Sequence, residues 1–297
     1  MDNLTHSLIG AVLGQAGLKR KTGLGMPTLV IAANIPDIDG VCMPLGTVSL
    51  AMRRGITHGP IAMLVLPLLL TGIMVWFDRG QARRGKRPAD RPPVDPAWLL
   101  VLACIGCLSH PLFDWMNSYG IRLLEPFSHR WFYGDALFIV DPWLLAMLIA
   151  GVWLARRWQS VRPARVAIAA VAAYLTLNLA ISGLAVQRLP RDLRASIAVA
   201  NPVPLAFWRR EVLWRDGRRY GSYIVDPWGA PRPGQAPRPI GMNDIRIMDR
   251  LPRSPEGQAL LFWSRLPVAE ARGDTVVLGD QRFQGRGAGT FTVELSP

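Results

Sequence analysis

Two ionisable residues lie four positions apart beside strongly apolar sequence. His110 and Asp114 belong to the stretch from Ser109 to Pro142, which lies between two hydrophobic runs. On a helix this spacing places both side chains on one face, one turn apart, where they can hold one cation between them. Ionisable side chains beside membrane-type sequence are costly to keep, so the pair indicates a functional site.

Three other short segments carry residues of the same types. They are Thr5-His6, Asp37-Ile38-Asp39 and Thr57-His58. Histidine nitrogen combined with carboxylate oxygen suits zinc, manganese or iron, whereas an all-oxygen set would suit magnesium or calcium. Asp37 and Asp39 could approach one or two cations from a loop, because Pro36 and Gly40 beside them predict a non-helical backbone. The candidate metal ligands are therefore His6, Asp37, Asp39, His58, His110 and Asp114.

Each segment taken alone has a simpler interpretation. An isolated His6 could be solvent exposed or cap a helix, and the two aspartates could form a turn or an N-cap. His58 could anchor the chain at a membrane interface, and the His110–Asp114 pair could be a satisfied polar contact between helices. The joint interpretation is stronger, because the chain has only four histidines and all of them lie near carboxylates at predicted membrane boundaries.

The composition predicts a membrane protein with a soluble appendage. Half of the 297 residues are hydrophobic and the mean hydropathy is +0.20, which is too apolar for an average soluble domain. Four apolar runs predict membrane spans, at residues 60–77, 97–113, 137–153 and 166–186. Two earlier runs, residues 4–18 and 26–35, are too short to span about 30 Å. They predict a hairpin of short helices packed through small residues.

The net charge of +13 lies largely in short loops. Residues 78–96 carry six Arg/Lys and residues 155–165 carry four, so the positive-inside rule places both loops in the cytoplasm. These charges predict orientation and contact with anionic membrane lipid, and they argue against a nucleic-acid partner. Alternation of the spans then predicts that every histidine and the C-terminal domain lie on the outer, periplasmic side.

Arginines and further carboxylates could complete a catalytic site. Arg54 and Arg122 could bind phosphate or carboxylate through their planar forks, although contact with lipid headgroups is a simpler role. With Asp39 or Asp114 as the base, the candidate catalytic residues are Asp39, Asp114, Arg54 and Arg122.

Three other polar residues of the 109–142 stretch have weaker claims to a catalytic role. Glu125 and His129 are most simply loop residues. Asp141 could orient a histidine or, equally, cap the third span.

The sequence changes in character after residue 187, where apolar runs shorten and Pro and Gly multiply. Residues 208–214 and 218–225, separated by Asp216-Gly217, predict a β-hairpin. Residues 274–278 and 290–295 predict further strands. We expect two domains, a membrane-embedded one at 1–187 and a small β-rich soluble one at 188–297. The expected fold class is mainly α, a membrane bundle of about four spans plus the N-terminal hairpin, with this β-rich domain attached.

Four sequence segments resemble a known family. They are TH near the start, NIPDID, RRGITHG and SHPLFDWMNSYGIRLLEPFS. Together they resemble the bacterial inner-membrane metal-dependent hydrolase family, the YdjM-like group, over roughly residues 1–190. The resemblance implies a multi-pass protein of the bacterial inner membrane, with a divalent-metal site at the six candidate ligands.

These observations predict a membrane-bound metal-dependent hydrolase with zinc, or alternatively manganese, as cofactor. A Lewis acid in such an enzyme polarises the scissile group and lowers the pKa of water toward about 7. The expected substrate is a phosphoester or ester of a lipid or lipid-linked molecule, because the candidate site lies at the bilayer boundary. The alternative is a transporter or lipid-binding membrane protein that uses the His/Asp cluster for an ion or a headgroup.

Overall fold

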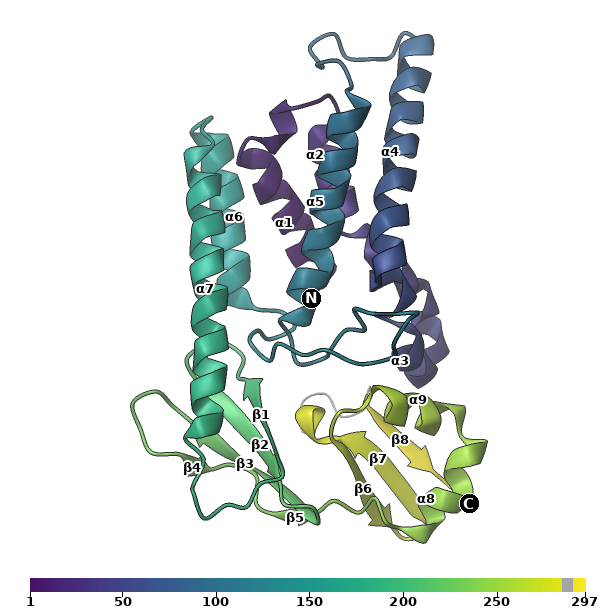
Figure 1. Ribbon diagram of the computed structural model, residues 1–297, viewed down its shortest axis with the longest axis vertical. Helices are drawn as coiled ribbons and strands as arrows, with labels where there is room; N and C mark the ends of the chain where they lie inside the picture. Colours follow the sequence, from purple (N-terminus) through teal and green to yellow (C-terminus); the bar gives the residue numbers. More distant parts are fainter. Residues whose placement is uncertain (285–290) are drawn as a thin grey trace. The chain divides into compact units, whose positions relative to one another are not determined.

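The computed structural model describes residues 1–284 and 291–297. The chain forms two compact units (Figure 1). The first unit contains Met1–Ile38 and Arg54–Leu177, and the second contains Asp39–Arg53 and Asn178–Pro297. The expected fold class is confirmed, since helices dominate the N-terminal part and antiparallel sheets form in the C-terminal part. The predicted domains, 1–187 and 188–297, stay a prediction.

The first unit is a helical bundle in which α5 packs against α1, α2 and α4. Its helices are α1 (Asn3–Gln15), α2 (Gly25–Ala32), α4 (Pro60–Arg83), α5 (Pro96–Trp115), α6 (Pro142–Arg157) and the first part of α7 (Arg162–Gln187). Shorter helical turns connect them, namely η1 (Leu18–Arg20), η2 (Ile35–Val48), α3 (Ser49–Met52) and η3 (Ile56–His58). The last residues of η2 and all of α3 belong to the second unit.

Aspartate caps and first-turn prolines determine where the longer helices begin. Asp95 accepts hydrogen bonds from the backbone of α5, and Asp141 does the same for α6 from Trp143 and Leu144 at 3.1 and 2.9 Å. Pro142 occupies the first helical turn, where its missing N–H is no loss. The third span expected at residues 137–153 is therefore wrong at its start, because α6 begins at Pro142.

Three helices, α4, α5 and α7, are long and apolar enough to cross a membrane. A fourth candidate is the bent pair Gly25–Ala32 and Ile35–Met52. Three of the four expected spans correspond to α4, α5 and α7. The span expected at 137–153 is not among the candidates found in the described residues, because α6 has 16 residues and reaches only about 24 Å at 1.5 Å per residue. Large apolar side chains are exposed along α4, among them Leu64, Leu68 and Trp76. Such a surface is suited to lipid.

The predicted N-terminal hairpin is confirmed, with α1 packed against α2 through small residues. Gly10 allows the backbones of α1 and α2 to approach each other closely. A Cβ there would lie 2.6 Å from the Leu29 carbonyl oxygen and 2.8 Å from Val30 Cα. The close packing of α1 and α2 therefore requires glycine at this position.

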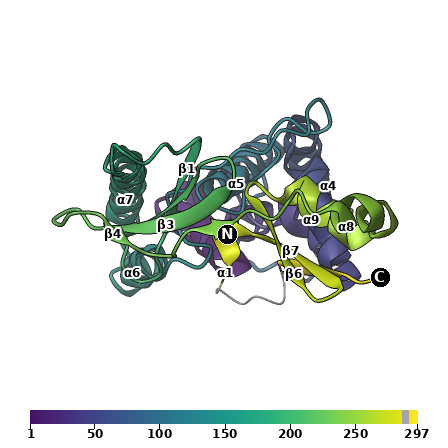
Figure 2. The ribbon, with the colours of Figure 1, turned by 90° about the horizontal axis from the view of Figure 1, so that it is seen from below.

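The second unit contains two antiparallel sheets, coloured green and yellow in Figure 2. The first sheet has the order β1-β2-β3-β4, and β5 also pairs with β3. Its strands are β1 (Ile197–Pro202), β2 (Arg210–Arg215), β3 (Arg219–Val225), β4 (Arg232–Pro233) and β5 (Arg238–Pro239). The second sheet has the order β6-β7-β8, with β6 (Pro267–Arg272), β7 (Thr275–Asp280) and β8 (Thr292–Leu295).

The predicted hairpin is confirmed as β2 and β3, in which Arg210 pairs with Val225 and Arg215 with Tyr220. Gly217 in the connecting turn has φ +96°, a conformation that glycine adopts without strain. The strand predicted at 274–278 is β7, and the one predicted at 290–295 is β8. Thr290 lies outside the described residues. Four further elements were not predicted from the sequence, namely β1, β6, α8 (Ile245–Arg250) and α9 (Pro255–Trp263).

The last turns of α7 join the first sheet through a buried arginine. The Arg210 guanidinium donates to Ser182 Oγ at 2.8 Å and to Asn178 Oδ1 at 2.9 Å. Because buried guanidinium groups need such acceptors, this contact fixes the end of α7 on β2.

We expect Gly10→Ala to destabilise the protein, whereas Gly72→Ala in α4 should leave stability unchanged or slightly higher. Overpacking at a close helix contact costs about 1–3 kcal/mol. A Cβ at Gly72 meets no described atom within 4 Å, and alanine favours a helix interior over glycine by about 0.5–1 kcal/mol. Thermal unfolding midpoints of the two purified variants in detergent provide the comparison. Equal midpoints would contradict the close packing of α1 on α2.

Candidate metal centre

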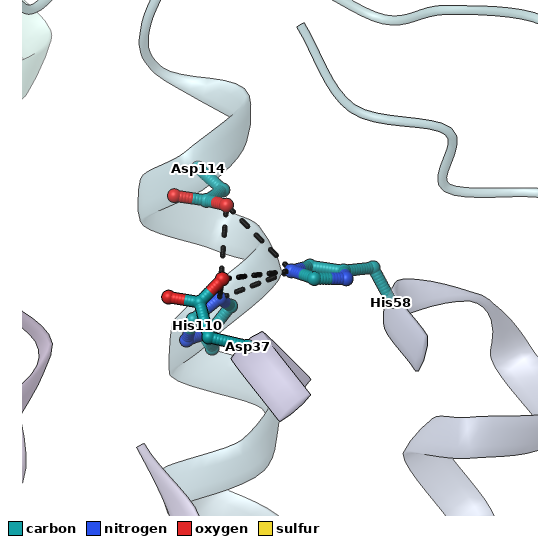
Figure 3. A group of neighbouring side chains, drawn as sticks. All are labelled: Asp37, His58, His110 and Asp114. Atoms are coloured by element: carbon teal, nitrogen blue, oxygen red, sulfur yellow. Dashed lines mark hydrogen bonds and ion pairs between the residues drawn. The ribbon is translucent and has the colours of Figure 1, made fainter. Parts of the chain in front are cut away.

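Four ligand-type side chains from three segments converge in the first unit (Figure 3). Asp37 comes from η2, His58 from η3, and His110 and Asp114 from α5. Each offers one donor atom, and these atoms all lie within 4.8 Å of one another. Both histidines and Asp114 are buried, while Asp37 is partly buried. We call these four residues the donor cluster.

The spacing of the donor atoms matches that around a small divalent cation. His58 Nε2 lies 3.1 Å from His110 Nε2. Each ring nitrogen lies 3.6 to 3.8 Å from Asp37 Oδ1 and from Asp114 Oδ2. Zinc with four ligands at about 2.0–2.1 Å in a tetrahedron separates its donors by about 3.3–3.4 Å. The residues present therefore fit zinc, and the mixed nitrogen and oxygen set also suits manganese.

Hydrogen bonds hold both imidazole rings with Nε2 toward the carboxylates. His110 Nδ1 lies 2.7 Å from the Ala33 carbonyl oxygen, which can only accept, so Nδ1 carries the hydrogen and Nε2 of the neutral ring carries the lone pair. His58 Nδ1 lies 2.9 Å from Thr57 Oγ1. Burial lowers the pKa of His58 to about 3, so this imidazole is neutral at pH 7. Backbone and hydroxyl partners of this kind are typical of metal-binding histidines.

Asp114 has partners at both carboxylate oxygens. Oδ2, which faces the two histidines, forms an ion pair with Arg54 Nε at 2.9 Å. Oδ1 lies 3.3 Å from His6 Nε2 and also contacts the Met1 ammonium group. These contacts fix the orientation of the carboxylate within the donor cluster.

His6 lies beside the donor cluster and is not one of its four members. Its ring stacks on that of His110 with centroids 3.8 Å apart. Burial lowers the pKa of His6 to about 4, so the ring is neutral and its Nε2–H can donate to Asp114. The structure thus places His6 where it supports Asp114 and His110. Its predicted role as a ligand stays a prediction.

Arg54 is held by residues that follow α5. Its Nη1 donates to Asn117 Oδ1 at 3.1 Å and to the Gly120 carbonyl oxygen at 3.3 Å. The guanidinium lies over the Tyr119 ring, 4.5 Å from its centroid. No role was predicted for Asn117 or Tyr119 from the sequence, although their positions three and five residues after Asp114 were a signal for them.

Arg122 belongs to a neighbouring ion-pair group. Its Nη1 lies 3.3 Å from Glu125 Oε2, and His129 Nδ1 lies 3.0 Å from the same carboxylate. The Arg122 backbone N–H donates to the Arg54 carbonyl oxygen at 2.9 Å. The structure therefore brings the two candidate catalytic arginines together through their backbones, and it gives the buried Glu125 a contact with both Arg122 and His129.

Three aspartates with predicted roles lie in different settings in the structure. Asp37 was expected on a non-helical backbone, which is wrong, because residues 35–48 run as 3₁₀ helix and the Asp37 N–H donates to Asn34 O at 3.0 Å. Asp39 is buried but is not among the four donors. For Asp141 the capping interpretation is confirmed, and its carboxylate also accepts from Tyr174 Oη at 3.1 Å.

A family model described as YdjM inner membrane protein matches residues 1–185 of the 297-residue chain. The match therefore covers more than half of the chain and includes the whole donor cluster. Searches of curated proteins and of solved structures found no match.

We expect Arg54→Gln to destabilise the protein strongly, whereas Arg130→Gln should have little effect. Removing Arg54 leaves Asp114 buried without its guanidinium partner, and breaking a buried ion pair costs about 3–5 kcal/mol. Arg130 lies in the connection between α5 and α6 and is exposed, so it provides a matched change of charge at a site without a buried ion pair. The midpoint of thermal unfolding of each variant at pH 7 provides the measurement. An unchanged midpoint for Arg54→Gln would show that the Arg54–Asp114 ion pair does not stabilise the protein.

Proposed function

We propose that this chain, which belongs to the YdjM inner membrane protein family, is a membrane-bound metal-dependent hydrolase. The observation that carries the proposal is the convergence of two histidines and two aspartates, in which each histidine nitrogen lies 3.1 to 3.8 Å from the other donor atoms. A divalent cation bound by these residues supplies Lewis-acid chemistry to a hydrolytic reaction. Zinc is the proposed cation and manganese the alternative.

The residues around the donor cluster receive proposed roles. Arg54 contacts Asp114 directly, so an anionic group of a substrate at the cluster would meet its guanidinium. Arg122, linked to Arg54 through the backbone, is the second proposed anion-binding group. Asp39 and Asp114 are the candidates for the base.

The proposed substrate is a phosphoester or ester of a lipid or a lipid-linked molecule. His110 and Asp114 lie in the last turns of α5, which ends at Trp115 and is a candidate membrane span. A cluster at the end of a span is located at the level of lipid headgroups. The charge pattern of the loops supports a periplasmic location of the cluster in the inner membrane.

Metal analysis tests the first step of the proposal. We expect wild-type protein purified in detergent to contain about one zinc or manganese per chain, as one four-ligand site requires. His58→Ala and Asp37→Asn each remove a ligand and should lose the metal, whereas His129→Ala, whose ring is exposed and outside the cluster, should keep it. Elemental analysis of the variants gives the answer. Equally low metal in all four proteins after loading with zinc would exclude a metal hydrolase.

Hydrolysis itself distinguishes an enzyme from a transporter or a lipid-binding protein. We expect zinc-loaded wild-type protein to cleave a chromogenic phosphoester or carboxylic ester, a chelator to abolish cleavage, and added zinc or manganese to restore it. His58→Ala should stay inactive under all three conditions. Tight metal binding without turnover of either ester class would favour the alternative, an ion or headgroup site.

The orientation has its own test. The loop charges predict that a reporter enzyme fused after Val186 is active in the periplasm. A fusion after Arg84, in the basic loop that follows α4, should report the cytoplasm. The reverse pattern would place the donor cluster on the cytoplasmic side and would remove a periplasmic substrate from consideration.

A further inference from the structure

The basic end of the first unit carries two adjoining cavities far from the donor cluster. The first is an open apolar groove of about 550 Å³ between α6 and α7. Its walls include Met147, Gly151 and Leu154 from α6 and Val166, Ala167 and Ala170 from α7. The second is a polar pocket of about 310 Å³ where the end of α1 meets the α6–α7 connection. Ser160 lines both cavities, so they adjoin each other at this residue.

Positive charge gathers in the polar pocket. Lys19, Arg20 and Arg156 line it, and among the described residues that line it there is no acid. In the part of the chain that the structure describes, no carboxylate forms an ion pair with these three cations. Burial and the nearby Arg20 and Arg156 lower the pKa of Lys19, which reflects the repulsion between them. The pocket therefore offers uncompensated positive charge to an anion.

The apolar groove has the character of a site for a hydrocarbon chain. Gly151 and Ala167 bring α6 and α7 close together at its base, since a Cβ on Gly151 would lie 2.4 Å from Ala167 Cβ. Val166 and Trp158 at its rim are exposed. Tryptophan at the end of an apolar helix is typical of the membrane interface, so the groove lies alongside lipid tails and the polar pocket alongside headgroups.

We propose that the two cavities form one binding site for an anionic glycerophospholipid, with its phosphate in the pocket and an acyl chain in the groove. Basic pockets beside spanning helices on the cytoplasmic side bind anionic headgroups, and the loop charges predict that side for this end. The site is separate from the donor cluster, because His6 and Gln15 lie nine residues apart on α1, about 14 Å. The proposal therefore does not depend on the proposed hydrolase activity.

Native mass spectrometry of the full chain in detergent tests the headgroup half of the site. We expect wild-type protein to retain phosphatidylglycerol over phosphatidylcholine with the same acyl chains. The triple variant Lys19→Gln, Arg20→Gln, Arg156→Gln should bind phosphatidylglycerol on the order of 100-fold more weakly, since each cation near a headgroup contributes about fivefold. The matched control is Arg83→Gln, Arg84→Gln, Lys86→Gln, which removes three exposed cations from the other basic loop and should bind like wild type.

A second pair of variants tests the acyl-chain half. Ala170→Phe fills the groove without changing charge and should weaken retention, whereas Ala169→Phe, on an exposed neighbouring position outside the groove, should not. Equal binding by wild type and the cationic triple variant would overturn the proposal, as would equal retention of phosphatidylcholine. Displacement of the lipid by inorganic phosphate, combined with no effect of Ala170→Phe, would indicate a free-anion site. A dimer whose formation Ala170→Phe abolishes would assign the groove to a second copy of the chain.

Discussion

The buried carboxylate of Asp114 is the constraint on which the first unit depends. A carboxylate in an apolar interior must be paired or must coordinate a metal, and Asp114 is fully buried. Its partners come from separate parts of the chain, His6 from α1, Arg54 from the segment before α4, and His110 from α5 itself. Helix α5 can therefore be buried in this bundle only when α1 and the segment before α4 are also in place. The contacts that build the donor cluster are the same contacts that hold the helices together.

The segment that carries Arg54 and His58 has an unusual backbone that allows close packing against the connection after α5. Arg54 has φ +53°, a left-handed conformation that is uncommon for a residue other than glycine. Gly55 and Gly59 leave room for the connection after α5, because a Cβ at Gly55 would lie 2.4 Å from Arg122 Nη2 and one at Gly59 would overlap the Glu125 carbonyl oxygen at 1.9 Å. Steric contact thus explains why glycine occupies both positions in the RRGITHG segment. They allow the backbone around His58 to lie directly against residues 122–125.

Local patterns in the sequence predicted those features that depend on short-range contacts. These features are the spacing of His110 and Asp114, the apolar runs of α4 and α5, and the hairpin around Gly217, and each lies within one element or two consecutive ones. Which ligand-type residues meet depends on long-range packing, and no local pattern shows that Asp37 lies in the donor cluster while His6 lies beside it. The same holds for residues 39–53, which belong to the second unit although both of their neighbours along the chain belong to the first. The start of α6 could have been predicted from Asp141-Pro142, which is a typical N-terminal capping sequence. The apolar run that begins five residues earlier, at residue 137, led to the wrong start.

The first unit separates two kinds of charge along α1. His6 contacts Asp114 near the start of the helix, and Gln15 and Lys19 line the basic pocket beyond its end. By the positive-inside rule, the basic end determines the orientation of the bundle, and that orientation in turn determines which side of the membrane the donor cluster faces. The cations near Lys19 and the ligands near Asp114 are thus connected through a helix of 13 residues. We expect a change that repositions α1 to act on both ends, because the close packing at Gly10 couples the middle of α1 to α2.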